Sequence, residues 1–264
     1  MTKKIRSSIT TLARTGLISK GVVYVIFGAI TFMAAFEIGG KSDEEANRKG
    51  VFSFVREAPA GKYILGALTL GLLCYSCWRM IEAFRKQKAK ENNKAKRVRY
   101  FFSSLTYASV AFTAVKIMVK GMQHSSDQKQ ELSSRVLQQP FGQWLLAAGA
   151  LILTGTGLYQ MWYGLSEKYK KHAGSVSNQK INGKLLLISG KLGYVARGIV
   201  WLLLSYLMMK AAFHSNAGEA GDTGKAFTLV ENNSMGSYIL AAIGMGLILY
   251  GIFTLIRARY ENFG

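Results

Sequence analysis

The stretch GLISKGVVYVIFGAITFMAAF, residues 16–36, decides the fold. It contains a single cation and otherwise has the length and apolar character of a helix that crosses a hydrocarbon layer, which takes about 20 residues. A second stretch, GYVARGIVWLLLSYLMMKAAF at residues 193–213, matches it at the first glycine, the cation, the next glycine and the closing Ala-Ala-Phe. Such self-similarity at a fixed shift indicates an internal repeat. The chain therefore contains at least two copies of a membrane-spanning unit.

Six stretches of the chain are long and apolar enough to span a membrane. Half of the residues are hydrophobic although 34 are Lys or Arg, so apolar and basic residues are segregated along the chain. The two-residue alternation of a membrane β-barrel is not seen. We therefore predict an all-α, polytopic membrane protein. The six expected transmembrane helices are Leu17–Phe36, Tyr63–Met80, Tyr100–Val119, Trp144–Gly164, Leu192–Phe213 and Tyr238–Ile256.

The repeated unit is a hairpin of two helices. Residues 61–75 match residues 236–250 at both glycines, at Tyr-Ile-Leu and at the final tyrosine. A more divergent middle copy is marked by Pro140-Phe141-Gly142, which corresponds to Pro59-Ala60-Gly61, but beyond Leu153 the register of its second helix is ambiguous. Parallel repeats of this kind are related by an axis along the membrane normal. We expect one membrane domain of three repeats, 1–90, 91–172 and 173–264, around a pseudo-threefold axis.

The net charge of +20 is explained by topology. Segments 1–20, 79–99, 164–197 and 257–264 together contain 23 Lys and Arg against 4 acidic residues. The alternating segments 37–62, 116–143 and 210–235 contain 11 against 10. Because short loops rich in Lys and Arg stay in the cytoplasm, both termini are expected there. The basic face is suited to anionic lipid headgroups, and we expect no binding of nucleic acid.

The repeat motif resembles the bacterial domain-of-unknown-function family numbered 1206. The residues that carry the resemblance are Leu12-Ala13-Arg14, Gly16, Lys20 to Tyr24, their echo Gly193 to Trp201, and Pro140-Phe141-Gly142. The resemblance implies tandem two-helix repeats, usually three, in a bacterial cytoplasmic (inner) membrane, and it implies no known activity. The middle copy departs from the pattern, because Ser103 stands where the other copies have a cation.

Residues that carry acid–base chemistry are missing from the expected helix cores. No Asp or Glu lies within them, and His124, His172 and His214 fall in loops or at a helix end. Proton relays and acid–base catalysts depend on such groups, so we expect neither an enzyme nor a catalytic residue. Cys74 and Cys77 form a C-x-x-C pair, but a structural metal site needs about four ligands. We interpret the pair as apolar packing and expect no metal and no cofactor.

Lys20 and Arg197 are the candidate binding residues. They occupy equivalent repeat positions near the cytoplasmic ends of the first and fifth expected helices. One interpretation is that both side chains snorkel to water. The other is that they line a site for phosphate or an anionic lipid, helped by the positive helix N-termini. The sequence leaves both open.

Glycines at seven-residue spacing indicate where helices pack. Seven residues is nearly two turns, so the members of a pair lie on one helix face, and small residues let membrane helices approach closely. The pairs that we assign to helix packing are Gly21/Gly28, Gly142/Gly149 and Gly244/Gly251.

Two classes of function remain open. The first is an accessory or scaffold protein that binds anionic lipid or a membrane partner, either another protein or further copies of itself. The second is a small channel or transporter with a pathway along the pseudo-threefold axis. The nearly continuous apolar cores favour the first. An axial cavity lined by Ser, Thr and Gln160 would favour the second.

The charge distribution yields a topology prediction. Single cysteines at positions 46, 126 or 217, in a protein whose Cys74 and Cys77 are replaced by alanine, should react with an impermeant maleimide from the periplasmic side only. Labelling of these positions from the cytoplasmic side would contradict the predicted orientation.

Overall fold

The computed structural model describes the whole chain except residues 1–2, 39–47, 85–93, 121–132, 140, 170–182, 222, 233–234 and 262–264. Within the described residues, the regular elements are all helices, and six of them are long and apolar enough to cross a membrane. These are α1 (Lys3–Ala34), α3 (Gly61–Phe84), α4 (Lys94–Lys120), α6 (Gly142–Leu165), α8 (Gly183–Phe213) and α10 (Gly236–Tyr260). The predicted all-α, six-span fold is confirmed. The expected repeat boundaries, Pro140 of the motif, labelling positions 46 and 126 and most of two basic loops lie outside the described residues.

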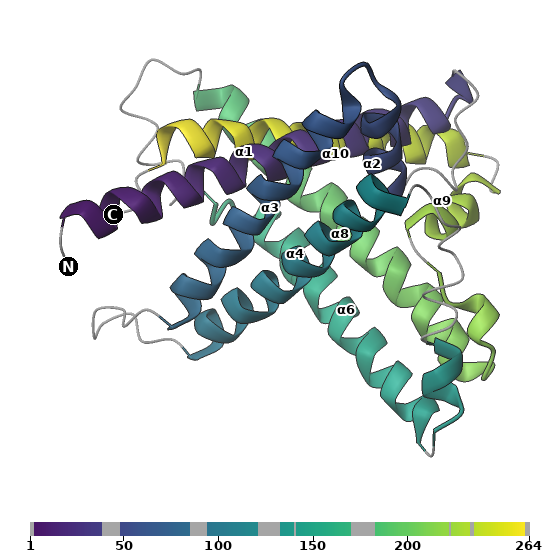
Figure 1. Cartoon of the computed structure of the whole chain (residues 1–264). Coiled ribbons are helices and arrows are strands. Elements are labelled where there is room, and N and C mark those ends of the chain that lie inside the picture. Colours follow the sequence, from purple (N-terminus) through teal and green to yellow (C-terminus); the bar gives the residue numbers. More distant parts are fainter. Residues whose placement is uncertain are drawn as a thin grey trace.

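Two helices begin well before the spans expected from hydropathy. α1 begins at Lys3 rather than near Leu17, and α8 begins at Gly183 rather than near Leu192. The residues before each expected span mix polar and apolar side chains, and they include no proline that would stop a helix. Hydropathy marks the start of the hydrocarbon layer, whereas backbone propensity sets the start of the helix. Figure 1 shows the beginning of α1 and the end of α10 at the same end of the bundle, as an even number of spans requires.

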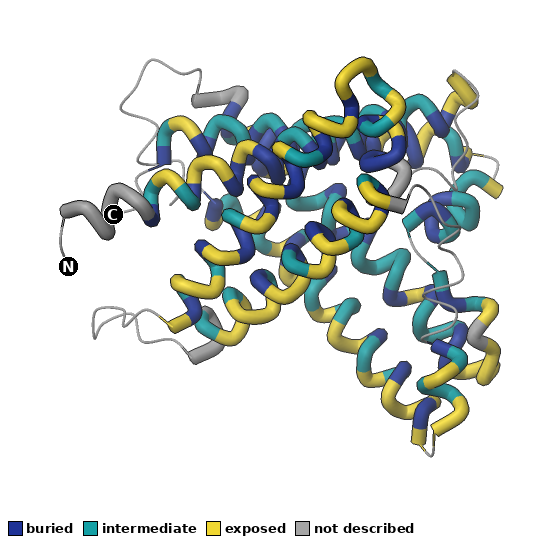
Figure 2. The backbone as a smooth tube through the Cα atoms, in the orientation of Figure 1, coloured by how far each residue is buried: buried dark blue, intermediate teal, exposed yellow. Residues whose placement is uncertain are grey.

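The spanning helices form an open ring (Figure 1). Neighbours pack in the order α4, α3, α1, α10, α8, α6. The two central helices of this order are the most enclosed, since 61% of the α1 span and 56% of the α10 span are buried, against 17% of the α6 span (Figure 2). Over the described residues, α4 and α6 stand at the two ends of the order and do not pack along each other. The ring is thus open between the two helices of the middle repeat.

Short helices precede the second span of each repeat. They are α2 (Arg48–Glu57), residues 133–137 and α9 (Thr223–Glu231). α2 and α9 each bury a phenylalanine completely, Phe52 and Phe227, at equivalent repeat positions. A glycine then begins each second span so close to the short helix that an added Cβ would lie 1.7–2.2 Å from a valine carbonyl oxygen. The glycine and valine pairs are Gly61 with Val55, Gly142 with Val136 and Gly236 with Val230.

Equivalent seams join the second helix of one repeat to the first helix of the next. Small residues meet at one level in all three seams, and in two of them also at a second level, seven residues away along both helices. At one level the pairs are Ser76 with Ser104, Gly157 with Gly198, and Gly251 with Gly21. At the other level the observed pairs are Ala150 with Ser205 and Gly244 with Gly28. The three hairpins are therefore parallel repeats around a pseudo-threefold axis.

These seams also settle the register of α6. Gly157 occupies the place of Ser76 and Gly251, so the correspondence that begins at Gly142 continues through α6 without an insertion. Tyr159 consequently corresponds to Trp78. The sequence left this register ambiguous because Tyr159 and Trp162 match Tyr75 and Trp78 only after a three-residue insertion.

Contacts inside a hairpin explain why the ring opens at the middle repeat. In the first repeat, Gly16 lies directly against the backbone of Tyr75, and an added Cβ would come within 2.5 Å of the Tyr75 Cα. In the third repeat Gly193 meets Tyr250 in the same way. The corresponding residue of the middle repeat is Arg99. A second close contact in each hairpin joins small residues, Ser19 with Gly71 in the first repeat and Ala196 with Gly246 in the third. In the middle repeat these two positions are occupied by Phe102 on α4 and Ile152 on α6. Large side chains on both helices keep α4 away from α6.

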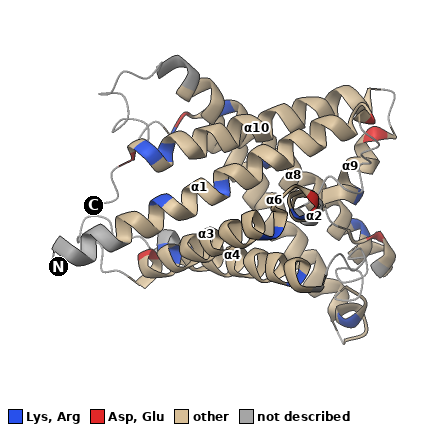
Figure 3. Cartoon of the chain, turned by 45° about the horizontal axis from the view of Figure 1, so that its top comes forward, with Lys and Arg blue, Asp and Glu red and all other residues tan. Residues whose placement is uncertain are grey.

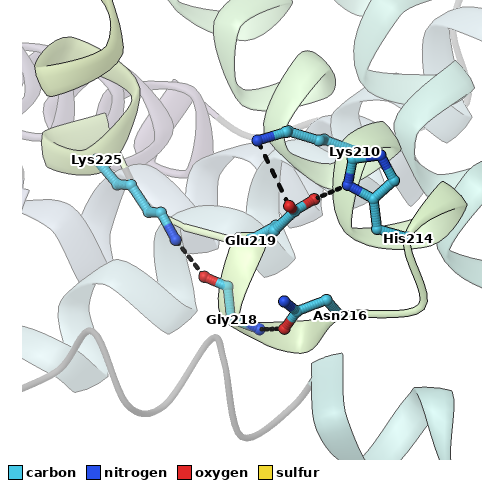
Figure 4. A network of polar contacts seen from close by, with 6 residues as sticks. All are labelled: Lys210, His214, Asn216, Gly218, Glu219 and Lys225. Atoms are coloured by element: carbon cyan, nitrogen blue, oxygen red, sulfur yellow. Dashed lines mark hydrogen bonds and ion pairs between the residues drawn. The ribbon is translucent and has the colours of Figure 1, made fainter. Parts of the chain in front are cut away.

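A polar network holds the loop that follows α8 (Figure 4). The Glu219 carboxylate of the short helix η4 (Ala217–Glu219) lies 2.8 Å from His214 Nδ1 and 3.4 Å from Lys210 Nζ. The Gly218 amide donates to Asn216 Oδ1, and Lys225 donates to the Gly218 carbonyl. The hydrogen bond with His214, with Lys210 nearby, lowers the pKa of Glu219. The stabilisation from this network is therefore fully present at a pH above the usual pKa of a glutamate. It is lost as the pH falls through the lowered pKa of Glu219.

The close approach at Gly193 yields a stability prediction. Gly193→Ala should destabilise the protein by about 1–3 kcal/mol, because the new methyl group forces α8 away from the Tyr250 backbone. Gly155→Ala is the matched control, since a Cβ there meets nothing within 4 Å. Thermal unfolding in detergent should show a lower midpoint for Gly193→Ala alone. Equal midpoints for the two variants would contradict this account of helix packing.

Candidate functional site

Four basic side chains from four helices gather inside the ring. They are Lys20 of α1, Arg79 of α3, Arg197 of α8 and Arg257 of α10. Lys20 and Arg257 are buried, and Arg79 and Arg197 are partly buried. Figure 3 shows that basic residues lie along α1 and at the end of α10 within otherwise uncharged helices. We call these four residues and the tyrosines around them the axial cluster.

Lys20 is enclosed by aromatic side chains. Its Nζ donates a 3.2 Å hydrogen bond to the Tyr75 hydroxyl. The same nitrogen lies 4.9 Å from the ring centre of Tyr75, 5.0 Å from that of Tyr107 and 5.5 Å from that of Tyr250. The side chain thus ends among protein groups and does not extend to the helix end, as snorkelling would require.

Arg197 repeats this arrangement in the third hairpin. Its guanidinium carbon lies 4.4 Å from the ring centre of Tyr250 and 5.1 Å from that of Tyr24. Its Nε is buried and has no hydrogen-bond partner among the described residues. The hydroxyl of Tyr107, which also belongs to the cluster, is buried without a partner in the same sense. The cluster therefore contains a charged donor that the described part of the chain leaves without an acceptor.

The two cations sit in equivalent tyrosine cages. Tyr75 and Tyr107 meet edge to face at 4.5 Å, and Lys20 lies against both rings. Tyr250 and Tyr24 meet edge to face at 4.8 Å, and Arg197 lies against both. In the register of the seams, the third cage would be formed by Ser103, Thr156 and Trp201, which supply neither a cation nor a tyrosine. The axial cluster thus has two filled cages and one vacant position.

Arg79 and Arg257 complete the cluster on the side of the chain termini. Arg79 Nε donates a 3.0 Å hydrogen bond to the Tyr75 hydroxyl, and its guanidinium stacks 4.3 Å from the Trp78 ring centre. Arg257 is held by Glu261 at 2.7 Å. Within the described residues, the other three cations form no ion pair with a carboxylate. The cluster therefore carries a net positive charge.

This charge has a clear chemical consequence. A desolvated cation gains about 2 kcal/mol from an aromatic face. That gain offsets part of the cost of a cation at bilayer depth, which is roughly 2.5–3.5 kcal/mol on insertion scales. An anion with several oxygen acceptors would satisfy the Arg197 donor and reduce the positive charge of the cluster. Among the described residues, no group of three His, Cys, Asp or Glu is placed to hold a metal ion.

The glycines assigned to packing lie at several kinds of contact. Gly21 and Gly28 of α1 face Gly251 and Gly244 of α10 across the first seam. Gly142 begins α6 beside the Val136 carbonyl, and Gly149 faces the Met208 side chain.

Cys74 and Cys77 are free thiols; Cys74 is partly buried and Cys77 is exposed.

Sequence reasoning found two members of the axial cluster and missed the rest. Tyr75 and Tyr250 were available as a matched pair in the repeat, but nothing along the sequence shows that their rings meet cations. Arg79 and Arg257 are not repeat equivalents, so the repeat gave no signal for them. Their assembly depends on the ring of helices.

The comparisons with known proteins agree with the repeat architecture. The sequence model of a family described as Domain of Unknown Function (DUF1206) matches three times, at residues 15–86, 98–167 and 192–261. A curated relative, described as the uncharacterized protein YxxB of Bacillus subtilis (strain 168), is 27% identical over 260 residues, which cover 94% of this chain and 90% of the relative. No solved structure matches the chain significantly.

The shared hydroxyl of Tyr75 yields a second stability prediction. Tyr75→Phe should destabilise the protein by roughly 1–3 kcal/mol, because Lys20 and Arg79 both lose their acceptor while remaining enclosed. Tyr206→Phe, at an exposed position, is the matched control and should be neutral. Chemical unfolding in detergent micelles measures both. An unchanged stability of Tyr75→Phe would show that the two cations do not depend on this hydroxyl.

Proposed function

Because the chain belongs to the family described as Domain of Unknown Function (DUF1206), whose description names no activity, we propose a function from the axial cluster itself. We propose that the protein is a non-enzymatic accessory protein of the bacterial cytoplasmic membrane, with both termini in the cytoplasm. Its axial cluster binds an anionic lipid through the headgroup phosphate.

The single observation that carries this proposal is the state of Arg197. Its Nε is buried, unpartnered within the described residues and enclosed by Tyr24 and Tyr250. A guanidinium binds phosphate oxygens through parallel hydrogen bonds, and such charge-assisted bonds are stronger in a partly dry site. Lys20 adds a second positive charge beside the same Tyr250 ring. A phosphate group has the charge and the acceptors that this pair lacks.

A binding role is better supported than conduction. At the level of Lys20, the interior is filled by aromatic rings, with Tyr75 and Tyr107 only 4.5 Å apart. Gln160, which the channel hypothesis invoked, is itself buried. A catalytic role has less support still, because the cluster consists of cations and tyrosines, which are suited to bind and orient an anion.

The test is lipid retention. Native mass spectrometry of the purified protein should show bound anionic phospholipid, and the double variant Lys20→Gln, Arg197→Gln should reduce its occupancy by about tenfold. Arg259→Gln is the matched control, because Arg259 is an exposed cation near the end of α10. Arg197→Lys should retain lipid partly, since it preserves the charge but not the planar pair of donors. Full retention by the double variant, with its fold intact, would exclude the axial cluster as the lipid site.

A further inference from the structure

The seam between α4 and α6 differs from the equivalent seams in the other hairpins. Where the first and third hairpins close through small residues, this one carries Arg99, Phe102 and Ile152. Phe102 and Ile152 are exposed, and a Cβ on Gly155 of α6 would meet nothing within 4 Å. The vacant third cage, with Ser103 and Thr156, lies in this same seam. The vacant third cage therefore lies between two helices that, over the described residues, do not pack along each other.

α4 carries a row of hydroxyl groups along this seam. In the first hairpin, Gly16 and Lys20 contact α3, so their counterparts Arg99 and Ser103 mark the face of α4 that turns to the seam. Thr106, Ser109 and Thr113 continue this face at helical spacing. Each of these three hydroxyls donates to the carbonyl four residues earlier, at 2.9–3.1 Å. The groups are thus satisfied within α4, and their oxygen atoms remain able to accept further hydrogen bonds.

Among the residues that the structure describes, a side-chain hydrogen bond links α4 to α6. Arg99 donates a 2.9 Å hydrogen bond from a terminal nitrogen to the Tyr159 hydroxyl, and both side chains are exposed. The contact lies near the first residue of the α4 span and the last turns of α6, at the end of the bundle where the chain termini lie. This is the hydrogen bond that Arg99 forms with the described residues, and a guanidinium has five donors. Arg99 therefore places a positive charge at the edge of the seam, and the axial cluster places further positive charge inside the ring.

Resting on the proposed function, we propose that the α4–α6 seam is the lateral binding site of one two-chain anionic phospholipid. The phosphate lies between Arg99 and the axial cations, next to the vacant cage. The acyl chains lie along the exposed apolar residues of the two helices. These residues are Phe102, Leu105 and Phe112 of α4 and Leu151, Ile152 and Leu158 of α6.

The side chains in the seam favour lipid over a protein helix. Membrane helices associate through small residues that allow close backbone approach, and the other hairpins follow this rule. The seam has large apolar side chains beside a polar row, a surface to which flexible chains and a polar headgroup adapt. Positive charge at its edge and behind it selects an anionic headgroup.

Photo-cross-linking tests this proposal. Benzoylphenylalanine is placed at Phe102 or at Ile152, and the protein is purified in detergent so that bulk lipid is removed. Illumination should add the mass of one phospholipid at either position. Phe84 of α3 is the matched control, since it is 64% exposed and Phe102 is 59% exposed, and it should remain without lipid. Adding Arg197→Gln to the Phe102 variant should lower the cross-linked fraction by about tenfold.

The remaining outcomes each decide a separate point. A cross-linked dimer of the chain would overturn the lipid assignment in favour of a second copy. Lipid that depends on Arg197 for retention but never cross-links at Phe102 or Ile152 would overturn the lateral site and leave the proposed function standing. Loss of the cross-link on addition of inorganic phosphate alone would show that the site takes a free anion. A Phe102 cross-link that is unaffected by Arg197→Gln would show that a seam lipid does not reach the axial cations.

Discussion

A cation inside a membrane bundle must be covered by groups that replace water, and this constraint organises the centre of the protein. Lys20 and Arg197 meet it through the faces and hydroxyls of tyrosines from neighbouring helices. Each cage draws on three helices: one carries the cation, its hairpin partner carries one ring, and the first helix of the next repeat carries the other. The cages therefore tie a hairpin together and also tie it to its neighbour. A repeat without the cation lacks its cage.

The middle repeat shows the result of such a loss. It has Ser103 in place of the cation and Arg99 in place of the glycine that admits the tyrosine backbone. Its seams to the neighbouring repeats persist, because Ser76 still meets Ser104 and Gly157 still meets Gly198. Its internal seam is the one that fails. The contacts between repeats and the contacts within a hairpin are thus separate, and a repeat can lose one set while the ring keeps the other.

The open middle hairpin gives the protein a surface, between α4 and α6, that a symmetric ring of three hairpins would not have. A closed ring of three equal hairpins would surround its cations with protein on every side. Opening one hairpin leaves a positively charged centre beside a row of hydroxyls and a lipid-facing apolar surface. An anionic lipid combines the matching properties, a charged phosphate and apolar chains, in one molecule. The proposed lateral site therefore follows from the divergence of the middle repeat, whereas the axial cations belong to the first and third repeats.

The sequence by itself determined the spans, the repeat and two of the central cations. Spans need only about 20 apolar residues in a row, and repeats show as matched residues such as Gly16 and Gly193, so both are local properties of the chain. The sequence did not show the tyrosine cages, because Tyr107 and Lys20 belong to different repeats and meet only when the ring of helices assembles. The opening between α4 and α6 was also decided by tertiary structure. Arg99 and Ile152 are unremarkable residues until their counterparts, Gly16 and Gly71, are seen to lie within van der Waals distance of a neighbouring helix. Close approach between helices is a property of pairs of surfaces, and a single sequence does not state which surfaces meet.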